Sequence, residues 1–480
     1  MSASTATTRV FESINPATEE VIASFDYFTS EQTEQALAEA DVAFRQWRET
    51  SRTERAAAMR RAAGLLRTRK DRYAGLITAE MGKPIAQAEA EVEKCAWVCE
   101  YFAENAERFL TRRPEQTSAR LSYVSFEPVG VVLAIMPWNF PFWQVFRFAA
   151  PTLMAGNTAV LKHASNVPQC ALAIEAVFRD AGFPGEGGGA FRTVLVPGAA
   201  VESMIQDPRV RAVTLTGSNA TGEKVAAAAG RALKKTVLEL GGSDPFIVLA
   251  DADLQAAAEM AVKSRFQNAG QSCIAAKRFI VVERVAEEFE GRFTDAIRKL
   301  KVGDPTDRSV DVGPLARGDL RDTVDRQVRE SVQQGARVVL GGAALPGRGF
   351  YYKPTLLVNV TDGMPALREE VFGPVAALAR VADTDAAIAL ANDTIYGLGA
   401  NLWTRDLDRA QVLAARIEAG SVFINGMVAS DPRLPFGGVK QSGYGRELSE
   451  FGIHEFVNIQ TVWIGGDGGP AKQQSAAGVA

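Results

Sequence analysis

The run AVTLTGSNATGEKVAAAAGRALKKTVLEL, residues 212–240, decides the fold. Ala212 to Leu215 has the apolar pattern of a strand, Thr221 to Leu233 favours a helix, and Lys235 to Leu240 favours a second strand. Strands that alternate with helices indicate a parallel sheet covered on both faces. Glycines between the first strand and the helix let backbone amides approach a phosphate, so this turn is a candidate nucleotide site as well as a simple turn.

The same alternation extends in both directions along the chain. It begins near Pro151, and a second alternating region from Pro245 to about Pro435 predicts a separate α/β domain. Residues 31–110 have helical periodicity, with predicted helices at 31–47, 52–67 and 86–109.

Two segments outside this alternation favour strands. Leu121 to Met136 is expected to form two strands that turn at Glu127-Pro128-Val129-Gly130, as an extended hairpin. Ile453 to Ile464 predicts a terminal strand, and the Gly-, Ala- and Gln-rich residues 465–480 predict a disordered tail.

A candidate nucleophile lies in Asn268-Ala269-Gly270-Gln271-Ser272-Cys273, between a predicted helix and a predicted strand. A thiol at a turn suits nucleophilic catalysis, although a free cysteine is more often a small buried hydrophobe. Glu239 ends a strand before two glycines, and Asn139 lies between two prolines in PWNFP, residues 137–141. A thiol, a carboxylate and an amide can attack a carbonyl, activate water and stabilise an oxyanion.

Composition limits the classes of partner. The 480 residues are 47% hydrophobic and 23% charged, with a net charge of −4, which indicates a globular protein without a basic nucleic-acid surface or membrane anchor. Four cysteines predict no disulfide framework and favour the cytoplasm, and with only two histidines no metal site is expected. No signal peptide is visible.

Six motifs give the chain a specific resemblance to the aldehyde dehydrogenases, and residues 161–168 and 270–278 look most like their succinate-semialdehyde branch. The motifs are PWNFP (137–141), LTGS (215–218), LELGG (238–242), GQSC (270–273), EEVFGPV (369–375) and PFGGVKQSGYGRE (435–447). The resemblance implies a Rossmann-type cofactor domain (1–120 and 141–244), an α/β catalytic domain (245–435) and a small β oligomerisation arm (121–140 and 453–464). It also implies a homodimer or homotetramer.

The resemblance assigns roles to residues near the cofactor. Candidate cofactor-binding residues are Trp138, Lys162, Ser165, Gly217, Ser218, Glu370 and Phe372. Family members that prefer NAD often carry a glutamate where this chain has Ser165, and a carboxylate there would repel a 2′-phosphate. NADP is therefore the expected cofactor, with use of NAD left open.

The implied catalytic residues are Cys273 as nucleophile, Asn139 at the oxyanion and Glu239 as the base that activates water. Because members that transfer the acyl group to coenzyme A or phosphate lack the glutamate, Glu239 favours release of a carboxylic acid. A thiol hydrolase could use the same cysteine and glutamate, but it would not need the loop at 216–222.

The substrate prediction rests on Arg147 and Ser430. Arg147 lies in an otherwise aromatic run after Asn139, where a substrate carboxylate or an internal carboxylate could pair with it. In relatives that oxidise succinic semialdehyde an arginine and a serine occupy these positions, whereas a second arginine of many such relatives is replaced here by Gln267. Succinic semialdehyde is the expected substrate, and another short aliphatic aldehyde or semialdehyde is the alternative.

Overall fold

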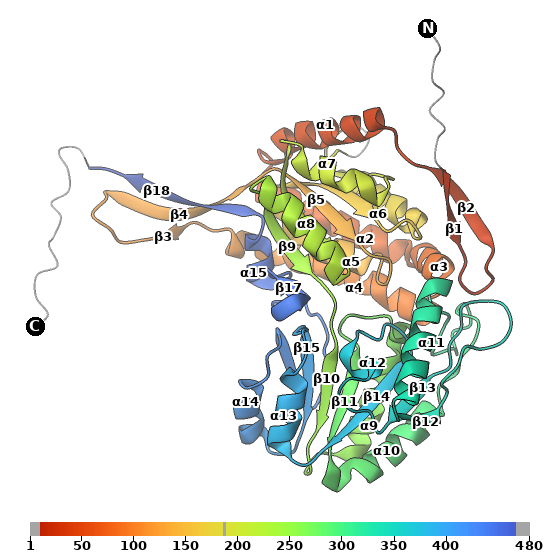
Figure 1. The fold of residues 1–480 in the computed structure, drawn as a ribbon. Coiled ribbons are helices and arrows are strands. Elements are labelled where there is room, and N and C mark those ends of the chain that lie inside the picture. Colours follow the sequence, from red (N-terminus) through yellow and green to blue (C-terminus); the bar gives the residue numbers. More distant parts are fainter. Residues whose placement is uncertain (1–9, 186–188, 467–480) are drawn as a thin grey trace, which may run out of the picture.

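The computed structural model describes residues 10–185 and 189–466, which form two α/β lobes and a projecting β arm (Figure 1). Each lobe is built on one mixed, mostly parallel sheet, which confirms the predicted fold class. The tail predicted at 465–480 lies almost entirely outside the described residues.

The first lobe contains a six-stranded sheet. Its strand order is β17 (Gly443–Tyr444), β9 (Lys235–Glu239), β8 (Val210–Thr216), β5 (Val131–Met136), β6 (Thr158–His163) and β7 (Phe191–Thr193). All neighbouring pairs are parallel except β17 with β9. From β5 the chain adds β6 and β7 on one side, and it then crosses to add β8 and β9 on the other side of β5. In open α/β sheets ligands bind at the carboxyl ends of strands at such a point.

Helices cover both faces of this sheet. One face packs against α1 (Ser30–Trp47), α7 (Val201–Gln206) and α8 (Asn219–Arg231). The other packs against α2 (Arg52–Thr68), α3 (Lys70–Met81), α4 (Ile85–Phe109), α5 (Trp143–Met154) and α6 (Pro168–Asp180). A short antiparallel pair, β1 (Val10–Ile14) and β2 (Val21–Asp26), precedes these helices.

The predicted hairpin at 121–136 is wrong. Strand β5 pairs with β6 and β8 in the six-stranded sheet, so it does not belong to the arm, whereas β4 (Leu121–Pro128) pairs with β18 (Val457–Ile464) and β3 (Arg113–Pro114). The reason is burial. Every residue of β5 is buried, with Val131 and Leu133 in the core of one face and Val132 and Ala134 in that of the other. A continuous apolar run is typical of a parallel strand covered on both sides.

The second lobe contains a seven-stranded sheet. Its order is β12 (Arg337–Leu340), β13 (Thr355–Val358), β14 (Val375–Val381), β11 (Ala276–Val282), β10 (Asp244–Val248), β15 (Gly399–Trp403) and β16 (Ser421–Ile424). One face packs on α9 (Leu254–Phe266), α10 (Glu283–Ile297), α11 (Gly318–Gln333) and α12 (Pro365–Arg368), the other on α13 (Thr384–Asn392) and α14 (Leu407–Ala414).

The chain returns to the first lobe after the second sheet. Strand β17 adds an antiparallel edge to β9, and helix α15 (Ser449–His454) then leads into β18 of the arm. The strand predicted from Ile453 therefore begins later, at Val457, because a helical turn precedes it. Within the described ranges, no helix is long and apolar enough to cross a membrane.

Candidate active site

Cys273 follows a backbone turn of unusual conformation between the two lobes. Asn268, Ala269 and Gly270 have φ values of 54°, 52° and 73°. These values lie in the left-handed region, which residues other than glycine rarely adopt. Glycine is required at the third position, because a Cβ on Gly270 would lie 2.3 Å from the carbonyl oxygen of Gly373. Strain of this kind persists only where the surrounding structure holds it.

A buried arginine fixes this turn to the loop after α12. The Arg265 guanidinium donates to the carbonyls of Gly270 (3.2 Å) and Val371 (3.0 Å), and also to that of Gly373. One side chain thus joins the turn before Cys273 to the segment that contains Glu370 and Phe372.

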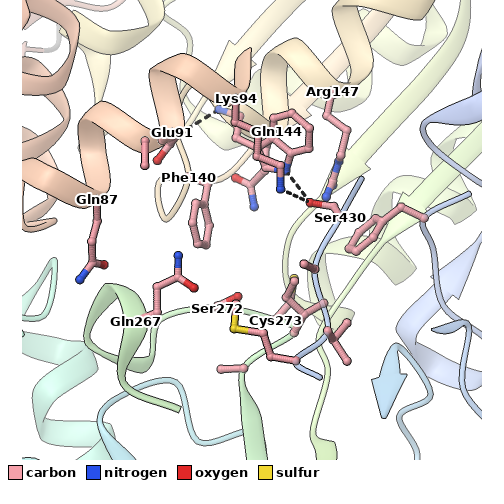
Figure 2. Close-up of a pocket in the computed structure, with 18 of the residues that line it drawn as sticks. Gln87, Glu91, Lys94, Phe140, Gln144, Arg147, Gln267, Ser272, Cys273 and Ser430 are labelled. Atoms are coloured by element: carbon pink, nitrogen blue, oxygen red, sulfur yellow. Dashed lines mark hydrogen bonds between the residues drawn. The ribbon is translucent and has the colours of Figure 1, made fainter. Parts of the chain in front are cut away.

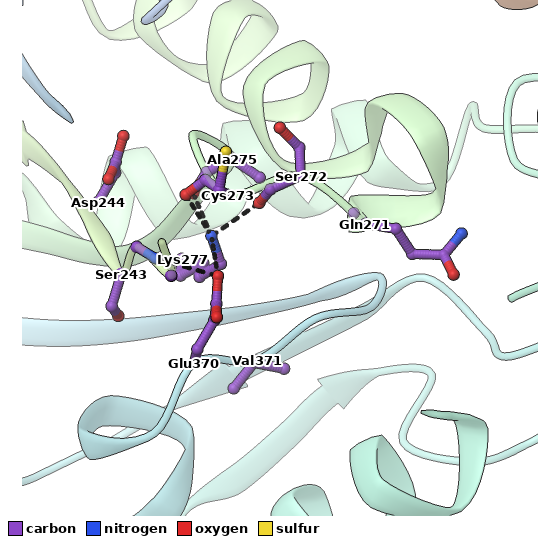
Figure 3. Close-up of polar contacts among 12 residues, drawn as sticks. Ser243, Asp244, Gln271, Ser272, Cys273, Ala275, Lys277, Glu370 and Val371 are labelled. Carbon is purple, nitrogen blue, oxygen red and sulfur yellow. Dashed lines mark hydrogen bonds and ion pairs between the residues drawn. The ribbon is translucent and has the colours of Figure 1, made fainter. Parts of the chain in front are cut away.

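A buried lysine holds the turn from below (Figure 3). The Lys277 ammonium donates to the carbonyls of Ser272 and Cys273, at 2.8 Å each, and lies 3.7 Å from the Glu370 carboxylate. Glu370 also accepts a hydrogen bond of 3.1 Å from the N–H of Gly242. Lys277 therefore links the backbone of the thiol residue to Glu370.

The thiol and the nearby carboxyl group are both driven towards their neutral forms. Burial raises the pKa of the Cys273 thiol to about 12, although the charges of Arg147 and Lys277 oppose that rise. Burial also raises the pKa of Glu239 well above its usual value. Neither Glu239 oxygen has a hydrogen-bond partner among the described residues. Glu239 is therefore a buried carboxyl group with free capacity to bind water or to exchange a proton.

The Asn139 amide is oriented towards the nucleophile turn. Its Nδ2 donates to the Gln271 carbonyl at 3.1 Å, and its Oδ1 accepts from Gln144 Nε2 at 3.0 Å, which fixes the direction of the amide. One Nδ2 hydrogen remains free. The N–H of Cys273 has no partner within residues 10–185 and 189–466. These two donors are suited to an oxyanion formed at the thiol.

Cys273 lines a cavity of about 170 Å³ between α4, α5 and the loop around Ser430 (Figure 2). Other lining residues include Lys94, Phe140, Trp143, Arg147, Gln267, Met427, Val428, Ser430 and Phe436. Ligand pockets are commonly roughly 300–1,000 Å³, so this space favours a small substrate. In Figure 2 the thiol lies on one side of the cavity, and Lys94, Arg147 and Ser430 lie on the other.

Arg147 lines the cavity, but its charge is already paired. Its guanidinium forms a buried ion pair with Glu447, lies 3.4 Å from Thr216 Oγ1 and stacks over the Phe436 ring at 4.5 Å. Of the two partners considered from sequence, the internal carboxylate is present in the structure. The pair occupies the Nε side of the guanidinium and compensates its charge.

The glycine loop after β8 opens towards solvent at the start of α8. Ser218 is the exposed N-cap residue of α8 and accepts a hydrogen bond from the N–H of Thr221 at 3.4 Å, with Gly217 directly before it. Lys162, in strand β6, donates to the carbonyl of His163 at 2.9 Å and has no carboxylate partner among the described residues. Ser165 is exposed in the turn after β6. An ammonium without a carboxylate partner among the described residues, an exposed hydroxyl and a helix N-terminus are suited to an anionic ligand.

An aromatic residue that follows strand β5 of the first lobe contacts one that precedes strand β14 of the second lobe. The rings of Trp138 and Phe372 pack edge to face, with centroids 5.8 Å apart. Glu370 approaches the backbone so closely that a Cβ on Gly241 would lie 2.6 Å from Glu370 Oε2. Glu370 therefore lies against the glycines that follow β9, and the two aromatic rings meet where the lobes adjoin.

Comparison with known proteins then decides the family. A family model described as the aldehyde dehydrogenase family matches residues 2–462. The chain belongs to the aldehyde dehydrogenase family. It is 53% identical over 451 residues to a probable succinate-semialdehyde dehydrogenase [NADP(+)] of Synechocystis sp., a match that covers 94% of this chain and 99% of the relative.

Two further matches support the same branch of the family. The succinate semialdehyde dehydrogenase [NAD(P)+] Sad of Escherichia coli (strain K12) is 51% identical over 94% of this chain and 97% of its own length. The crystal structure of succinic semialdehyde dehydrogenase from Streptococcus pyogenes, in complex with NADP+, superposes with a TM-score of 0.92 at 38% identity. That match covers 95% of this chain and 100% of the other. The resemblance inferred from the six motifs is confirmed.

Three residues that touch this aldehyde dehydrogenase site were not predicted from sequence: Lys94, Lys277 and Glu447. Lys94 lies in α4, a region for which the sequence predicted only helices, and Lys277 is the second residue of β11, the strand after the thiol. Glu447 ends a recognised motif but carried no assigned role. The available signal for Lys277 was its place beside Arg278 at the start of a strand whose other residues are apolar, since buried charged side chains require partners.

Proposed function

We propose that this protein oxidises succinic semialdehyde to succinate with NADP as the preferred cofactor. The observation that carries the proposal is the cavity that contains both the Cys273 thiol and, on its other side, hydrogen-bond donors from Lys94, Arg147 and Ser430. A substrate with an aldehyde at one end and a carboxylate at the other matches that arrangement. The names of the relatives at 51–53% identity support the same substrate.

In the proposed mechanism the Cys273 thiol gives its proton to solvent water, and the thiolate sulfur bonds to the aldehyde carbon while the carbonyl π electrons move onto oxygen. The oxygen of the resulting thiohemiacetal accepts hydrogen bonds from Asn139 Nδ2 and the Cys273 N–H. NADP, when bound, supplies the hydride acceptor. Glu239 takes a proton from the water molecule that hydrolyses the cysteine thioester, and succinate leaves. The raised pKa of Glu239 brings this carboxyl group closer to the range in which it exchanges protons at neutral pH.

Several side chains support the cofactor assignment. Lys162, Gly217 and Ser218 would hold its phosphates and adenosine ribose, since they offer donors at the carboxyl ends of β6 and β8. Ser165 would donate to the 2′-phosphate, and a serine at this position adds no negative charge of its own. Glu370, Phe372 and Trp138 would hold the nicotinamide half, as the resemblance to the family implies. Lys277 connects Glu370 to the backbone of Cys273, and the Phe372 and Trp138 rings pack together.

We also infer that the protein forms a homodimer or homotetramer through the β arm. Strand β18 is an edge strand, and its Ile459 and Trp463 side chains are 61% and 53% exposed. Exposed apolar residues on an open edge favour pairing with a second copy. All four cysteines are free, which fits the reducing environment of the cytoplasm.

The test compares succinic semialdehyde with butanal, which has the same four-carbon chain but no carboxylate. Initial rates of NADPH formation are measured by absorbance over a range of each aldehyde. We expect kcat/KM for succinic semialdehyde to exceed that for butanal by at least roughly tenfold, the contribution of one charge-assisted hydrogen bond. Equal values would contradict the substrate assignment without affecting the assignment to the family.

A further inference from the structure

The charges around the cavity are balanced except at one residue. Three charged side chains line it: Glu91, Lys94 and Arg147. Glu91 forms a buried ion pair with Lys83 and accepts from the N–H groups of Phe142 and Trp143. Arg147 is paired with Glu447. Lys94 forms no ion pair with any residue in the described ranges, so the cavity has one uncompensated positive charge.

Lys94 is held at the cavity wall by two neutral groups. Its Nζ lies 2.9 Å from Ser430 Oγ and 4.2 Å from the centre of the Trp143 ring (Figure 2). An ammonium has three N–H donors, and these contacts leave at least one of them without a partner. The Trp143 ring stabilises the cation by cation–π attraction but supplies no counter-charge.

Ser430 completes a set of donors. Its Oγ accepts two hydrogen bonds, from Lys94 Nζ at 2.9 Å and from Trp143 Nε1 at 3.1 Å. Both lone pairs of the hydroxyl are therefore used, and the hydroxyl hydrogen can only be donated. No described residue accepts it. Lys94 and Ser430 together present donors without an acceptor, which is the requirement for binding a carboxylate.

We propose that Lys94 is a substrate-specificity residue that binds the carboxylate of the semialdehyde, together with the Ser430 hydroxyl. The proposal rests on the proposed function and identifies the positive charge that the substrate meets. Arg147 can still donate hydrogen bonds from N–H groups that Glu447 does not occupy, but its charge is already matched by that carboxylate. Gln267, which also lines the cavity, contributes no charge.

The pKa of Lys94 gives a second way to test this role. Burial and the nearby charge of Arg147 lower the pKa of Lys94 to about 8, while Cys95, Asp431 and Glu91 act in the opposite direction. Below that pH the ammonium is charged and can bind a carboxylate. As the pH rises through about 8 it becomes neutral, so selectivity for a charged substrate should fall.

The experiment measures kcat/KM for succinic semialdehyde and for butanal in wild type, Lys94→Met, Lys94→Arg and a control, Lys263→Met. Lys263 is an exposed lysine on α9 that does not line the cavity. We expect Lys94→Met to lower kcat/KM for succinic semialdehyde by roughly tenfold or more and that for butanal by less than about twofold. Lys94→Arg should restore part of the preference, and Lys263→Met should leave both values unchanged.

The ratio of the two kcat/KM values is also measured in wild type from pH 6.5 to pH 9.5, chosen to bracket about 8. Because both substrates use the same thiol, the ratio cancels the ionisation of Cys273. It should fall as the pH rises through about 8 in wild type. The decline should move to higher pH in Lys94→Arg, since guanidinium stays charged.

The outcomes separate this inference from the proposed function. If wild type shows no preference for succinic semialdehyde, the proposed substrate is wrong. If wild type prefers it and Lys94→Met keeps that preference, the role of Lys94 is wrong while the proposed function stands. Should Lys94→Met fail to fold, Lys94→Gln is measured in its place: a retained preference for succinic semialdehyde would overturn the Lys94 role, and a lost preference with butanal activity intact would support it.

Discussion

Replacement of Lys277 by methionine should impair catalysis without removing any group that contacts the aldehyde. Lys277 is fully buried, donates to the carbonyls of Ser272 and Cys273 at 2.8 Å and lies 3.7 Å from Glu370. Methionine keeps a similar length and apolar stem but supplies neither donors nor charge. The turn that carries the thiol then loses these two short hydrogen bonds and a longer one of 3.3 Å, from Lys277 to the Ala275 carbonyl.

The magnitude follows from those two bonds. A hydrogen bond to a charged group contributes about 1.5–3 kcal/mol, whereas burying an ammonium costs several kcal/mol, so the net change in the free energy of unfolding should be small. The effect on catalysis is not offset in this way, because removing the buried charge does nothing to restore the position of the thiol. Losing one bond of this strength in the transition state lowers kcat/KM by roughly ten- to a hundredfold.

The assay combines steady-state kinetics with alkylation of the thiol by iodoacetamide across a range of pH. Lys277 opposes the rise of the Cys273 pKa that burial causes, so its removal should raise that pKa further and move the alkylation profile to higher pH. Lys299→Met, at an exposed lysine, is the matched control. A folded Lys277→Met variant with wild-type kcat/KM and an unchanged alkylation profile would refute the positioning role.

The remaining predictions concern the thiol, the base, the cofactor and the ion pair. Cys273→Ala should abolish oxidation while NADP binding, followed by fluorescence titration, persists; more than a few per cent of wild-type activity would contradict its role as nucleophile. Glu239→Gln should give one burst of reduced cofactor in stopped-flow absorbance followed by slow turnover, and unchanged turnover would exclude it as the base. Ser165→Glu should raise KM for NADP far more than KM for NAD, since only NADP carries the additional phosphate; equal increases would mean that Ser165 does not face the ribose. Arg147→Ala leaves Glu447 as an unpaired buried carboxylate, so thermal or urea unfolding should show a loss of about 3–5 kcal/mol, and activity should fall with both aldehydes; a loss confined to succinic semialdehyde would instead assign the substrate carboxylate to Arg147.

The regular pattern of the chain predicted most of the fold because the signals are local. Helices such as α2 and α9 and the strands around residues 212–240 follow from the period of their apolar residues. Strand β5 shows where local signals fail. A Pro-Val-Gly turn after one strand and before another predicts a hairpin, but burial of β5 on both faces places it in the centre of a parallel sheet. That choice depends on helices distant in sequence.

The candidate site also has one part that local sequence predicts and one part that depends on the fold. Cys273, Glu239 and Asn139 could be proposed from sequence because each lies in a recognisable motif at the end of a strand or turn. The charge balance of the cavity could not be predicted from sequence, because it depends on which charged side chains form ion pairs in the folded protein. The charge of Arg147 is compensated by Glu447, which is far from it in the sequence. Lys94 has no ion-pair partner among the described residues, because Glu91, one helical turn before it, pairs with Lys83 instead.

The most direct test of the proposed function is a single-turnover experiment with wild type, NADP and succinic semialdehyde, in which reduced cofactor and succinate are both quantified. We predict that each molecule of NADPH is accompanied by one molecule of succinate. In Cys273→Ala neither product should form. Succinate without NADPH, or NADPH formation that persists in Cys273→Ala, would contradict oxidation through the cysteine.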